Sequence, residues 1–400
     1  MLVVHKYGGT SVGDVERIEN VTNRVARARE EGHDIVVVVS AMSGETNKLI
    51  SYANHFTQIP AKKEMDMLLS SGERVTAALL SIALQARGYD AVAMTGRQAG
   101  ILTDTKHTFA RIESIDPKAV KTAIRQGKIV IVAGFQGINR EGCVTTLGRG
   151  GSDLSAVALA AAIGADQCEI YSDVDGIYTT DPRIEPKAKK LDTISYDEML
   201  ELSSLGAKVL QNRSVELAKK LNVKLYAKSS FSNDIGTLIT EEENMEAVLV
   251  SGIVLDKNQA RVTLRGVADR PGIAAEIFTK LAEADINVDM IIQNVGTDES
   301  TNLGFTVPQS EHENAKSVME DFSDEFEGMD FDEHVCKVSV VGVGMKSHSG
   351  VAATAFTVMA KNNINIQMIS TSEIKVSMVI DEKYGELAIR SLHEAYELDK

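Results

Sequence analysis

The last third of the chain carries one pattern twice, and this repeat constrains the fold more than any other feature. Residues 262–294 and 338–371 share glycines, an Ile-Asn pair and a methionine at offsets of 76 and then 78 residues. Each copy has the pattern of a strand, a glycine-containing loop, a helix and a second strand. Two copies are too few for a solenoid, so we expect a pair of small, related βαββαβ domains.

The first 240 residues alternate short β-rich apolar runs with amphipathic stretches of helix length. Strands are expected at 2–7, 35–40, 91–94, 129–134, 168–171 and 223–227, and helices at 14–31, 62–87, 152–163 and 207–221. This alternation is typical of an α/β fold with a mostly parallel sheet covered by helices. We therefore expect an α/β domain over 1–240, an acidic linker with a first strand over 241–260, and the repeated domains over 261–333 and 334–400.

Charge and composition exclude several classes of protein. The 400 residues carry a formal net charge of −15, which argues against a general nucleic-acid binder. This charge is uneven, because residues 1–240 sum to +1 and residues 241–400 to −16. The three cysteines, Cys143, Cys168 and Cys336, fit neither a disulfide framework nor a zinc site, and no metal-ligating set is predicted. We expect no membrane span and no leader, and hence a cytoplasmic protein.

Two glycine-rich segments each stand ahead of an expected helix. They are KYGGTS from Lys6 to Ser11 and TTLGRGGSD from Thr145 to Asp153. Glycines there let backbone N–H groups approach an anion, and the N-terminus of the following helix favours negative charge. Lys6 and Arg149 would add fixed positive charge. From the residues alone, a tight structural turn stays open for the first segment, and helix capping by Ser152 and Asp153 stays open for the second.

A third segment, EIYSDVDGIYTTDPR from Glu169 to Arg183, runs from an expected strand into a polar loop. Its aspartates do not have the spacing of an EF-hand calcium loop, which also needs a closing glutamate. A nucleotide-binding loop fits better, although the single acids could equally be turn formers.

These three segments, with VVVVSAMSGETNKL, MDMLLSSGERV, VAGFQGI and SYDEMLELSSLGAKVL in this order, resemble the aspartate kinases of the amino acid kinase family. The paired repeats resemble their C-terminal, ferredoxin-like ACT domains, so the resemblance covers nearly the whole chain. It implies that a segment near 247–256 pairs into the second ACT domain. It also implies phosphorylation of the L-aspartate side-chain carboxylate by ATP with Mg²⁺, the first step of lysine, threonine and methionine synthesis.

The resemblance also implies site residues. Lys6 and Asp153 would be catalytic, with Asp153 orienting Lys6. Aspartate would be bound by Ser40, Thr46, Glu73, Arg149, Gly150, Gly151 and Ser152. ATP would be bound by Lys6, Tyr7, Gly8, Gly9, Ser172, Asp173, Tyr178, Asp181, Arg183 and Lys208. Because a glutamate repels a carboxylate, Glu73 should face the substrate ammonium. No general base is needed, since the attacking carboxylate is already ionised near neutral pH.

For the back half the resemblance implies feedback by lysine, threonine or both. The effector candidates are Asp269, Asn287, Val288, Asp289, Gln293, Met345, Val351, Asn365 and Ile366. Their alternative role as turn and core residues stays open. A homo-oligomer through the ACT domains is expected, and an internal start near Met245 would give an α2β2 complex with a shorter subunit. The competing hypotheses are a glutamate or acetylglutamate kinase, and a catalytically inactive amino-acid sensor.

Overall fold

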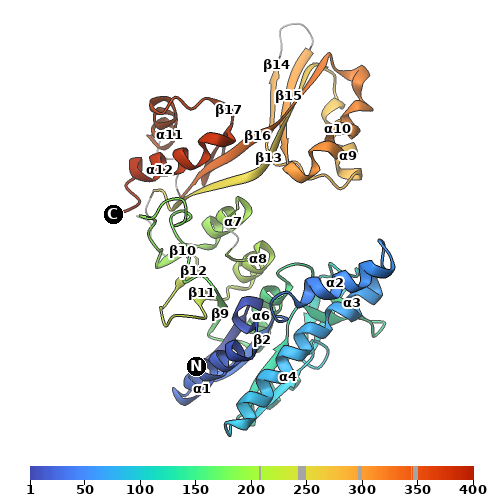
Figure 1. Ribbon diagram of the computed structural model, residues 1–400, viewed down its shortest axis with the longest axis vertical. Coiled ribbons are helices and arrows are strands. Elements are labelled where there is room, and N and C mark those ends of the chain that lie inside the picture. The colour runs from blue at the N-terminus through green and yellow to red at the C-terminus, as the bar shows by residue number, and fades with distance from the viewer. Residues whose placement is uncertain (207–208, 242–248, 296–299, 344, 346–349) are drawn as a thin grey trace. The chain divides into compact units, whose positions relative to one another are not determined.

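The computed structural model describes residues 1–206, 209–241, 249–295, 300–343, 345 and 350–400 (Figure 1). The chain forms two compact units. The first contains Met1–Ile177 and Lys190–Met245, and the second contains Tyr178–Lys189 and Glu246–Lys400.

The first unit is built on an eight-stranded sheet in the order β10-β12-β11-β9-β1-β2-β6-β3. All its neighbouring strands are parallel except β11 and β12. The strands are β1 Leu2–Tyr7, β2 Asp34–Val39, β3 Ala91–Met94, β6 Ile129–Ala133, β9 Gln167–Ser172, β10 Thr193–Ser195, β11 Leu225–Ser229 and β12 Thr237–Thr240. The expected mostly parallel α/β fold is therefore confirmed, and each of the six predicted strands is present.

Helices cover this sheet, and a second, four-stranded sheet in the order β5-β4-β7-β8 lies in the same unit. The helices are η1 Gly9–Val12, α1 Val15–Glu30, α2 Glu45–Phe56, α3 Lys62–Leu69, α4 Ser71–Ala86, α5 Lys118–Arg125, α6 Gly151–Ile163, α7 Tyr196–Ser204 and α8 Asn212–Leu221. The strands of the small sheet are β4 Ile101–Thr103, β5 Ile112–Ile115, β7 Gln136–Ile138 and β8 Val144–Thr146.

Strand β1 serves both faces of the large sheet. Successive side chains of a strand point to opposite faces. Tyr7 accordingly joins the core formed with α1 and α4, whereas Lys6 reaches Asp153 on α6. Helix α6 is apolar on all sides and buried along nearly its whole length, as its run of alanine, leucine and valine predicts. A lysine directed at this buried helix therefore has little contact with water.

Two predicted helices differ in extent from the structure. The predicted helix 62–87 is two helices, α3 and α4, which meet at Ser70. The predicted helix 207–221 begins only at Asn212, because Gln211 has extended backbone angles. By length and composition alone, Lys62–Ala86 would suffice to cross a membrane, where the sequence analysis expected no such segment. In this unit it is a covering layer, with Leu80 and Leu84 fully buried against the sheet.

The second unit is a six-stranded antiparallel sheet in the order β14-β15-β13-β16-β18-β17. Its strands are β13 Gly252–Ala268, β14 Ile291–Val295, β15 Ser300–Val307, β16 Gly328–Val341, β17 Ile366–Thr371 and β18 Lys375–Asp381. Its helices are α9 Ile273–Glu283, η2 Gln309–Glu311, α10 His312–Glu320, η3 Ser323–Glu325, α11 Gly350–Lys361, η4 Glu382–Tyr384 and α12 Gly385–Ala395.

The two repeats share this sheet but have separate hydrophobic cores. The long strand β13 belongs to both. Its residues 252–256 pair with 337–341 of β16 beside the second repeat, and its residues 260–268 pair with β15 of the first. Over the described residues, each repeat thus has four strand segments and two α-helices.

Residues 178–189 leave the first half of the sequence to fold with this second unit. Ile253 N–H donates to the Thr179 carbonyl at 2.7 Å, and the Thr179 hydroxyl lies 3.0 Å from His393 Nε2 on α12. Ile184 packs on the core of the second repeat. The sequence analysis assigned residues 178–189 to the 1–240 domain. The tertiary contacts that hold this segment against the second unit leave no pattern in the local sequence.

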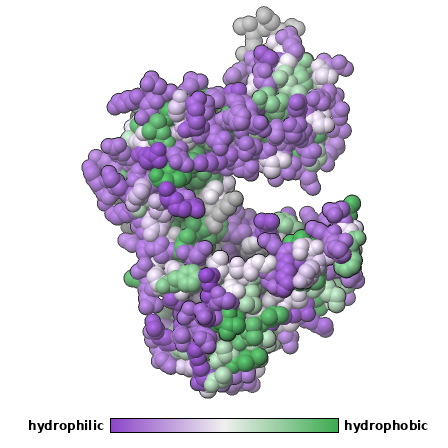
Figure 2. Space-filling view, viewed as in Figure 1, coloured by the Kyte–Doolittle hydropathy of each residue, from purple (hydrophilic) through white to green (hydrophobic). Residues whose placement is uncertain are grey.

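Helix α4 also has an apolar outer face, where Figure 2 shows hydrophobic surface. Val75, Leu79 and Ile82 are 53%, 36% and 61% exposed there, whereas Leu80 is fully buried. Apolar residues of α4 are therefore found on both its buried and its exposed face, so hydropathy alone does not identify the buried face.

We expect Leu80→Ala to lower the free energy of unfolding of the first unit by about 2–5 kcal/mol, through lost burial and a residual cavity. Ile82→Ala on the same helix is the control and should change it by no more than about 0.5 kcal/mol. Urea unfolding followed by circular dichroism measures both. Equal effects of the two substitutions would contradict the assignment of the buried face.

Candidate functional site

A buried ion pair lies at the carboxyl end of β1. Lys6 Nζ is 2.6 Å from Asp153 Oδ1, and each residue is only 8% exposed. Lys6 comes from the centre of the sheet and Asp153 from the first turn of α6. A charge buried this deeply needs a partner, so the pair holds the ammonium in one place. The predicted juxtaposition of Lys6 and Asp153 is present.

The glycine turn follows directly. Gly8 N–H donates to the Tyr171 carbonyl at 3.1 Å and extends the β1–β9 ladder, and η1 begins at Gly9. A Cβ at Gly9 would lie 3.1 Å from the Ala41 carbonyl oxygen, so the turn passes close to the end of β2. Ser40 N–H donates to the Tyr7 carbonyl at 3.1 Å. These contacts bring the predicted residues Gly8, Gly9 and Ser40 together.

Tyr7 can offer a ligand only its backbone. Its ring is fully buried and stacks on Tyr171 at 4.8 Å between centroids. Burial also raises the pKa of the Tyr7 phenol well above its ordinary value. The predicted role of Tyr7 in binding ATP is therefore limited to main-chain groups.

Glu73, in the first turn of α4, is 4% exposed. Its Oε1 accepts a hydrogen bond from Ala41 N–H at 3.1 Å, while Oε2 is buried with no partner among the described residues. Burial raises the pKa of this carboxyl to about 7. In the unfolded chain the Glu73 carboxyl has its ordinary, lower pKa and loses its proton first. Between that pKa and about 7 the folded chain therefore binds more protons, and the free energy of unfolding falls as pH rises. Thr46, the other predicted partner of a substrate ammonium, is half-buried at the start of α2.

The second glycine-rich segment forms an open turn ahead of α6. Gly148 and Gly150 have φ of +81° and +70°, which favour glycine, and the Arg149 side chain between them is exposed. The first residues of α6, Gly151 and Ser152, are buried. Gly150 occupies the cap position and no side chain caps the helix, so the capping alternative for Ser152 and Asp153 is wrong. Arg149 is therefore exposed just ahead of a helix N-terminus whose first residues are buried.

The predicted ATP residues fall into two groups. Ser172 ends β9 beside the glycine turn, and Asp173 follows it, exposed. Three others, Tyr178, Asp181 and Arg183, lie in the second unit. There Arg183 forms a two-pronged ion pair with Asp181, at 2.7 Å for the closest contact, and this hydrogen bonding lowers the pKa of Asp181. Lys208 lies outside the described residues, as does Met245.

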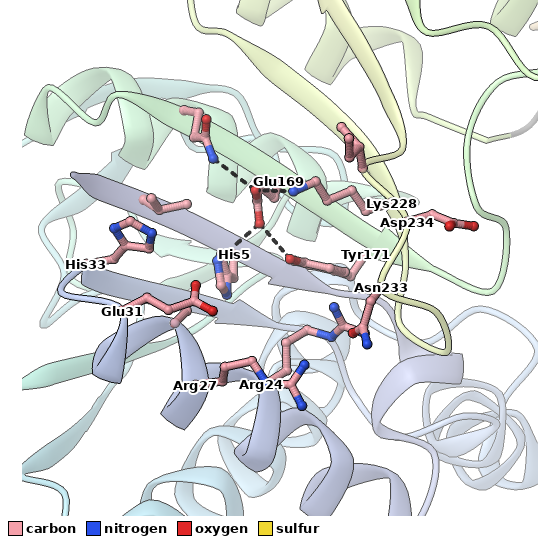
Figure 3. A pocket seen from close by; sticks show the side chains of 14 residues that line it. His5, Arg24, Arg27, Glu31, His33, Glu169, Tyr171, Lys228, Asn233 and Asp234 are labelled. Atoms are coloured by element: carbon pink, nitrogen blue, oxygen red, sulfur yellow. Dashed lines mark hydrogen bonds and ion pairs between the residues drawn. The ribbon is translucent and has the colours of Figure 1, made fainter.

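The face of β1 opposite Lys6 carries a polar network that the sequence analysis missed (Figure 3). Glu169, 4% exposed, pairs with His5 Nε2 at 3.1 Å and accepts hydrogen bonds from the Tyr171 hydroxyl at 2.6 Å and from Lys228. Burial opposes ionisation, but His5 and Lys228 outweigh it and lower the pKa of Glu169. The only sequence signal was the alternation of His5 with Tyr7 and of Glu169 with Tyr171.

This network borders a cavity of about 420 Å³ that contains none of the predicted site residues. His5 pairs across the ladder with Glu169, and Tyr7 with Tyr171. We infer that these two cross-strand pairs fix the register of β1, and hence the position of Lys6 between them.

The predicted effector residues divide by burial. Asp269, Asn287, Gln293 and Asn365 are exposed, whereas Met345 and Val351 are buried in the core of the second repeat, against which Ile366 packs. Val288 packs on the core of the first repeat. The exposed Asp289 forms an ion pair with Lys337, a buried residue of β16. Met345 and Val351 could therefore contribute only backbone groups to a ligand.

Comparison with known proteins follows the same division of the chain. Residues 1–229 match the amino acid kinase family, and residues 262–327 and 338–396 each match an ACT domain. The aspartokinase of Helicobacter pylori is 58% identical over 405 residues, which cover 100% of both chains.

Two crystal structures of E. coli aspartokinase III are also similar. The complex with aspartate and ADP, described as the R-state, is 26% identical with a TM-score of 0.80 and covers 99% of each chain. The complex with lysine and aspartate, described as the T-state, is 26% identical with a TM-score of 0.79, covering 98% of this chain and 99% of that one. With a relative this similar over its whole length, and with an ion-paired lysine at the glycine turn, the chain belongs to the aspartokinase family of the amino acid kinases.

Proposed function

We infer that this chain transfers the γ-phosphoryl group of ATP to the side-chain carboxylate of L-aspartate, giving 4-phospho-L-aspartate and ADP. The observation that carries this function is the buried Lys6–Asp153 pair at the glycine turn. The full-length aspartokinase relative and the structure of E. coli aspartokinase III with aspartate and ADP support it. The two ACT domains disfavour a glutamate or acetylglutamate kinase, and an intact Lys6–Asp153 pair disfavours an inactive sensor.

The chemical problem is to bring two anions together. The aspartate side chain is ionised near neutral pH, so catalysis requires positioning and charge compensation rather than a base. Lys6 binds the oxygens of the phosphoryl group during its transfer. Asp153 keeps the Lys6 ammonium in place. The N–H groups of the Gly8–Gly9 turn contact the same phosphates.

Two groups of opposite charge recognise aspartate. Arg149 holds a substrate carboxylate with its planar fork of donors. Glu73 receives the substrate ammonium on its buried Oε2, which has no hydrogen-bond partner in the part of the chain that the structure describes. Ser40, Thr46 and the start of α6 complete this binding site.

ATP brings Mg²⁺ with it in this proposal. Magnesium in kinases is held largely by phosphate oxygens with one or two carboxylates. Among the described residues there is no group of three His, Cys, Asp or Glu side chains that could hold a metal ion. When bound, it neutralises charge on the phosphates. The other residues proposed to contact ATP, besides those of the glycine turn, are Ser172, Asp173, Tyr178, Asp181, Arg183 and Lys208.

We propose that lysine, threonine or both inhibit through the ACT domains. Lysine is bound in the T-state structure of E. coli aspartokinase III. Three of the proposed ATP residues lie on 178–189, which hydrogen-bonds to β13 and contacts α12 within the second unit. A ligand that moves the second repeat would therefore also move these three residues.

Location and assembly are proposals as well. We propose a cytoplasmic homo-oligomer joined through ACT domains, with a second product that starts near Met245. Native mass spectrometry checks the assembly, and finding only full-length chains would remove the shorter subunit.

A hydroxamate assay with ATP tests the function directly. We expect activity with aspartate and little with glutamate, and inhibition by lysine or threonine at up to millimolar concentration. A protein that binds lysine but phosphorylates neither substrate would be a sensor.

We expect Arg149→Lys to raise the KM for aspartate tenfold or more, because a lysine cannot reproduce two parallel hydrogen bonds to a carboxylate. The KM for ATP should stay within about twofold, since the loss of a substrate contact leaves nucleotide binding intact. Arg140→Lys is the control, because Arg140 is exposed and pairs with Glu113 at 3.0 Å. An unchanged aspartate KM in Arg149→Lys would contradict the assigned role.

Aspartate binding should depend on pH through Glu73, whose pKa burial raises to about 7. Only the ionised form attracts an ammonium, so kcat/KM for aspartate should fall as pH drops below 7. In Glu73→Gln it should be low at every pH and lack this transition. ATP titrates equally in both proteins, so the ratio of their pH profiles isolates Glu73. The exposed Glu64→Gln should keep the wild-type profile; the same transition in Glu73→Gln would refute the assignment.

We expect His393→Leu to raise the half-inhibitory lysine concentration several-fold, because it removes the contact of α12 with Thr179. Aspartate KM should change little. Arg390→Gln is the control on the same helix, where Arg390 is exposed. Equal inhibition of all three proteins would exclude this route of regulation.

A further inference from the structure

Asp66 on α3 is a fully buried carboxylate without a place in the proposed mechanism so far. Its Oδ1 accepts from the Thr146 hydroxyl at 2.5 Å and from Thr108 N–H at 3.0 Å. Its Oδ2 lies 2.6 Å from His107 Nδ1 and 3.2 Å from Thr108 N–H. Both oxygens are therefore satisfied, by groups from two other segments of the first unit.

Such an arrangement is expensive to maintain. A buried carboxylate is tolerated only when hydrogen bonds replace its lost water. One of its partners is itself strained, because Thr108 has φ of +68°, a left-handed conformation that a β-branched residue rarely adopts. Asp66 receives the N–H of this strained residue. Thr108 and Asp66 both cost stability, so we infer that this arrangement is kept because it fixes the positions of the segments it joins.

The hydrogen bonds of Asp66 lead to the Arg149 turn by two routes. Thr146 is the last residue of β8, three positions before Arg149. Through the other route, Phe109 follows Thr108 and lies against Gly148, where a Cβ would come within 2.6 Å of the Phe109 ring. The two routes also join directly, since Ala110 N–H donates to the Thr146 carbonyl at 2.9 Å.

Arg213 also holds the main chain next to the Arg149 turn. Arg213 donates to the Leu147 carbonyl at 2.6 Å and to the Ala110 carbonyl at 3.1 Å, with its guanidinium 4.6 Å from the Phe109 ring centroid. On the other side of Gly148, Gln211 donates to the Arg149 carbonyl at 3.1 Å, while the Arg149 side chain stays exposed.

Asp66 is also linked to the other recognition group. It stands one turn before Ser70, whose N–H donates to the Asp66 carbonyl at 3.0 Å and at which α3 gives way to α4. Gln136 on β7 donates to the Ser70 carbonyl at 2.9 Å. Glu73 lies in the next helical turn. One carboxylate therefore connects the helix that carries Glu73 to the turn that carries Arg149.

We propose that Asp66 is a positioning residue for L-aspartate, which sets the Arg149 turn relative to Glu73 without touching the substrate. This inference rests on the proposed function, because it assumes that these two residues bind aspartate. Nucleotide binding at the Gly8–Gly9 turn does not depend on Asp66 in this scheme.

The test compares Asp66→Asn and Thr146→Val with wild type. Asp66→Asn changes the acceptor for three donors, and Thr146→Val removes one hydrogen bond while keeping the side-chain shape. We expect Asp66→Asn to raise the aspartate KM about tenfold or more, as for the loss of a hydrogen bond to a charged group. Thr146→Val should raise it in the same direction but less. The ATP KM should stay within about twofold in both, measured with aspartate saturating.

Asp34→Asn is the matched control, because it also converts a paired carboxylate to an amide, in a surface pair with Arg29. Its kinetic constants should equal those of wild type. Thermal unfolding of each variant separates lost stability from lost positioning.

Each result bears on a separate statement. Equal rises in both KM values, or a lower melting temperature with unchanged KM values, would overturn the positioning role and leave a structural one. If Asp66→Asn does not fold, Thr146→Val decides alone, and an unchanged aspartate KM in it overturns the proposal. Failure of the wild-type chain to phosphorylate aspartate would instead refute the proposed function.

Discussion

The buried ion pair between Lys6 and Asp153 is the interaction on which the site depends. A lysine in the central strand of a sheet is tolerated there because α6, which is mostly apolar, presents a carboxylate to it at 2.6 Å. On the opposite face, the pairs His5–Glu169 and Tyr7–Tyr171 hold β1 in register with β9. A one-residue slip would turn Lys6 away from α6, so the sheet itself places the charge that we propose contacts the phosphoryl group.

Asp153, Asp66 and Glu73, three of the buried carboxylates in this unit, differ in how their oxygens are satisfied, and that difference separates their proposed roles. Asp153 has a permanent cation, and Asp66 has donors for both oxygens. Among the described residues, Glu73 has a hydrogen bond to one oxygen only, and burial raises its pKa to about 7. Glu73 is therefore the carboxylate suited to a positively charged ligand, because the ligand would supply the partner that Oε2 lacks among the described residues.

Much of the fold could be predicted from short-range patterns, but the second unit shows where such patterns end. Hydrophobic periodicity located the strands of the large sheet, and the repeat predicted two related modules. It did not reveal that β13 runs through both modules, because a 17-residue strand shared by two cores has the same local pattern as two strands. Nor did it place 178–189 with the second unit, where the contacts of Thr179 with Ile253 and His393 lie 74 or more positions away in sequence.

The sequence by itself determined the family, the motifs and the chemical types of the site: a lysine before two glycines, an arginine between glycines, and a glutamate at a helix start. These follow from residue identity and short spacing. Tertiary structure alone decided which of them are buried, that Asp153 caps no helix but pairs with Lys6, and that Asp66 joins three segments. Burial and hydrogen bonding across 42 and 80 positions of sequence depend on how the chain packs, and a local pattern contains no record of that packing.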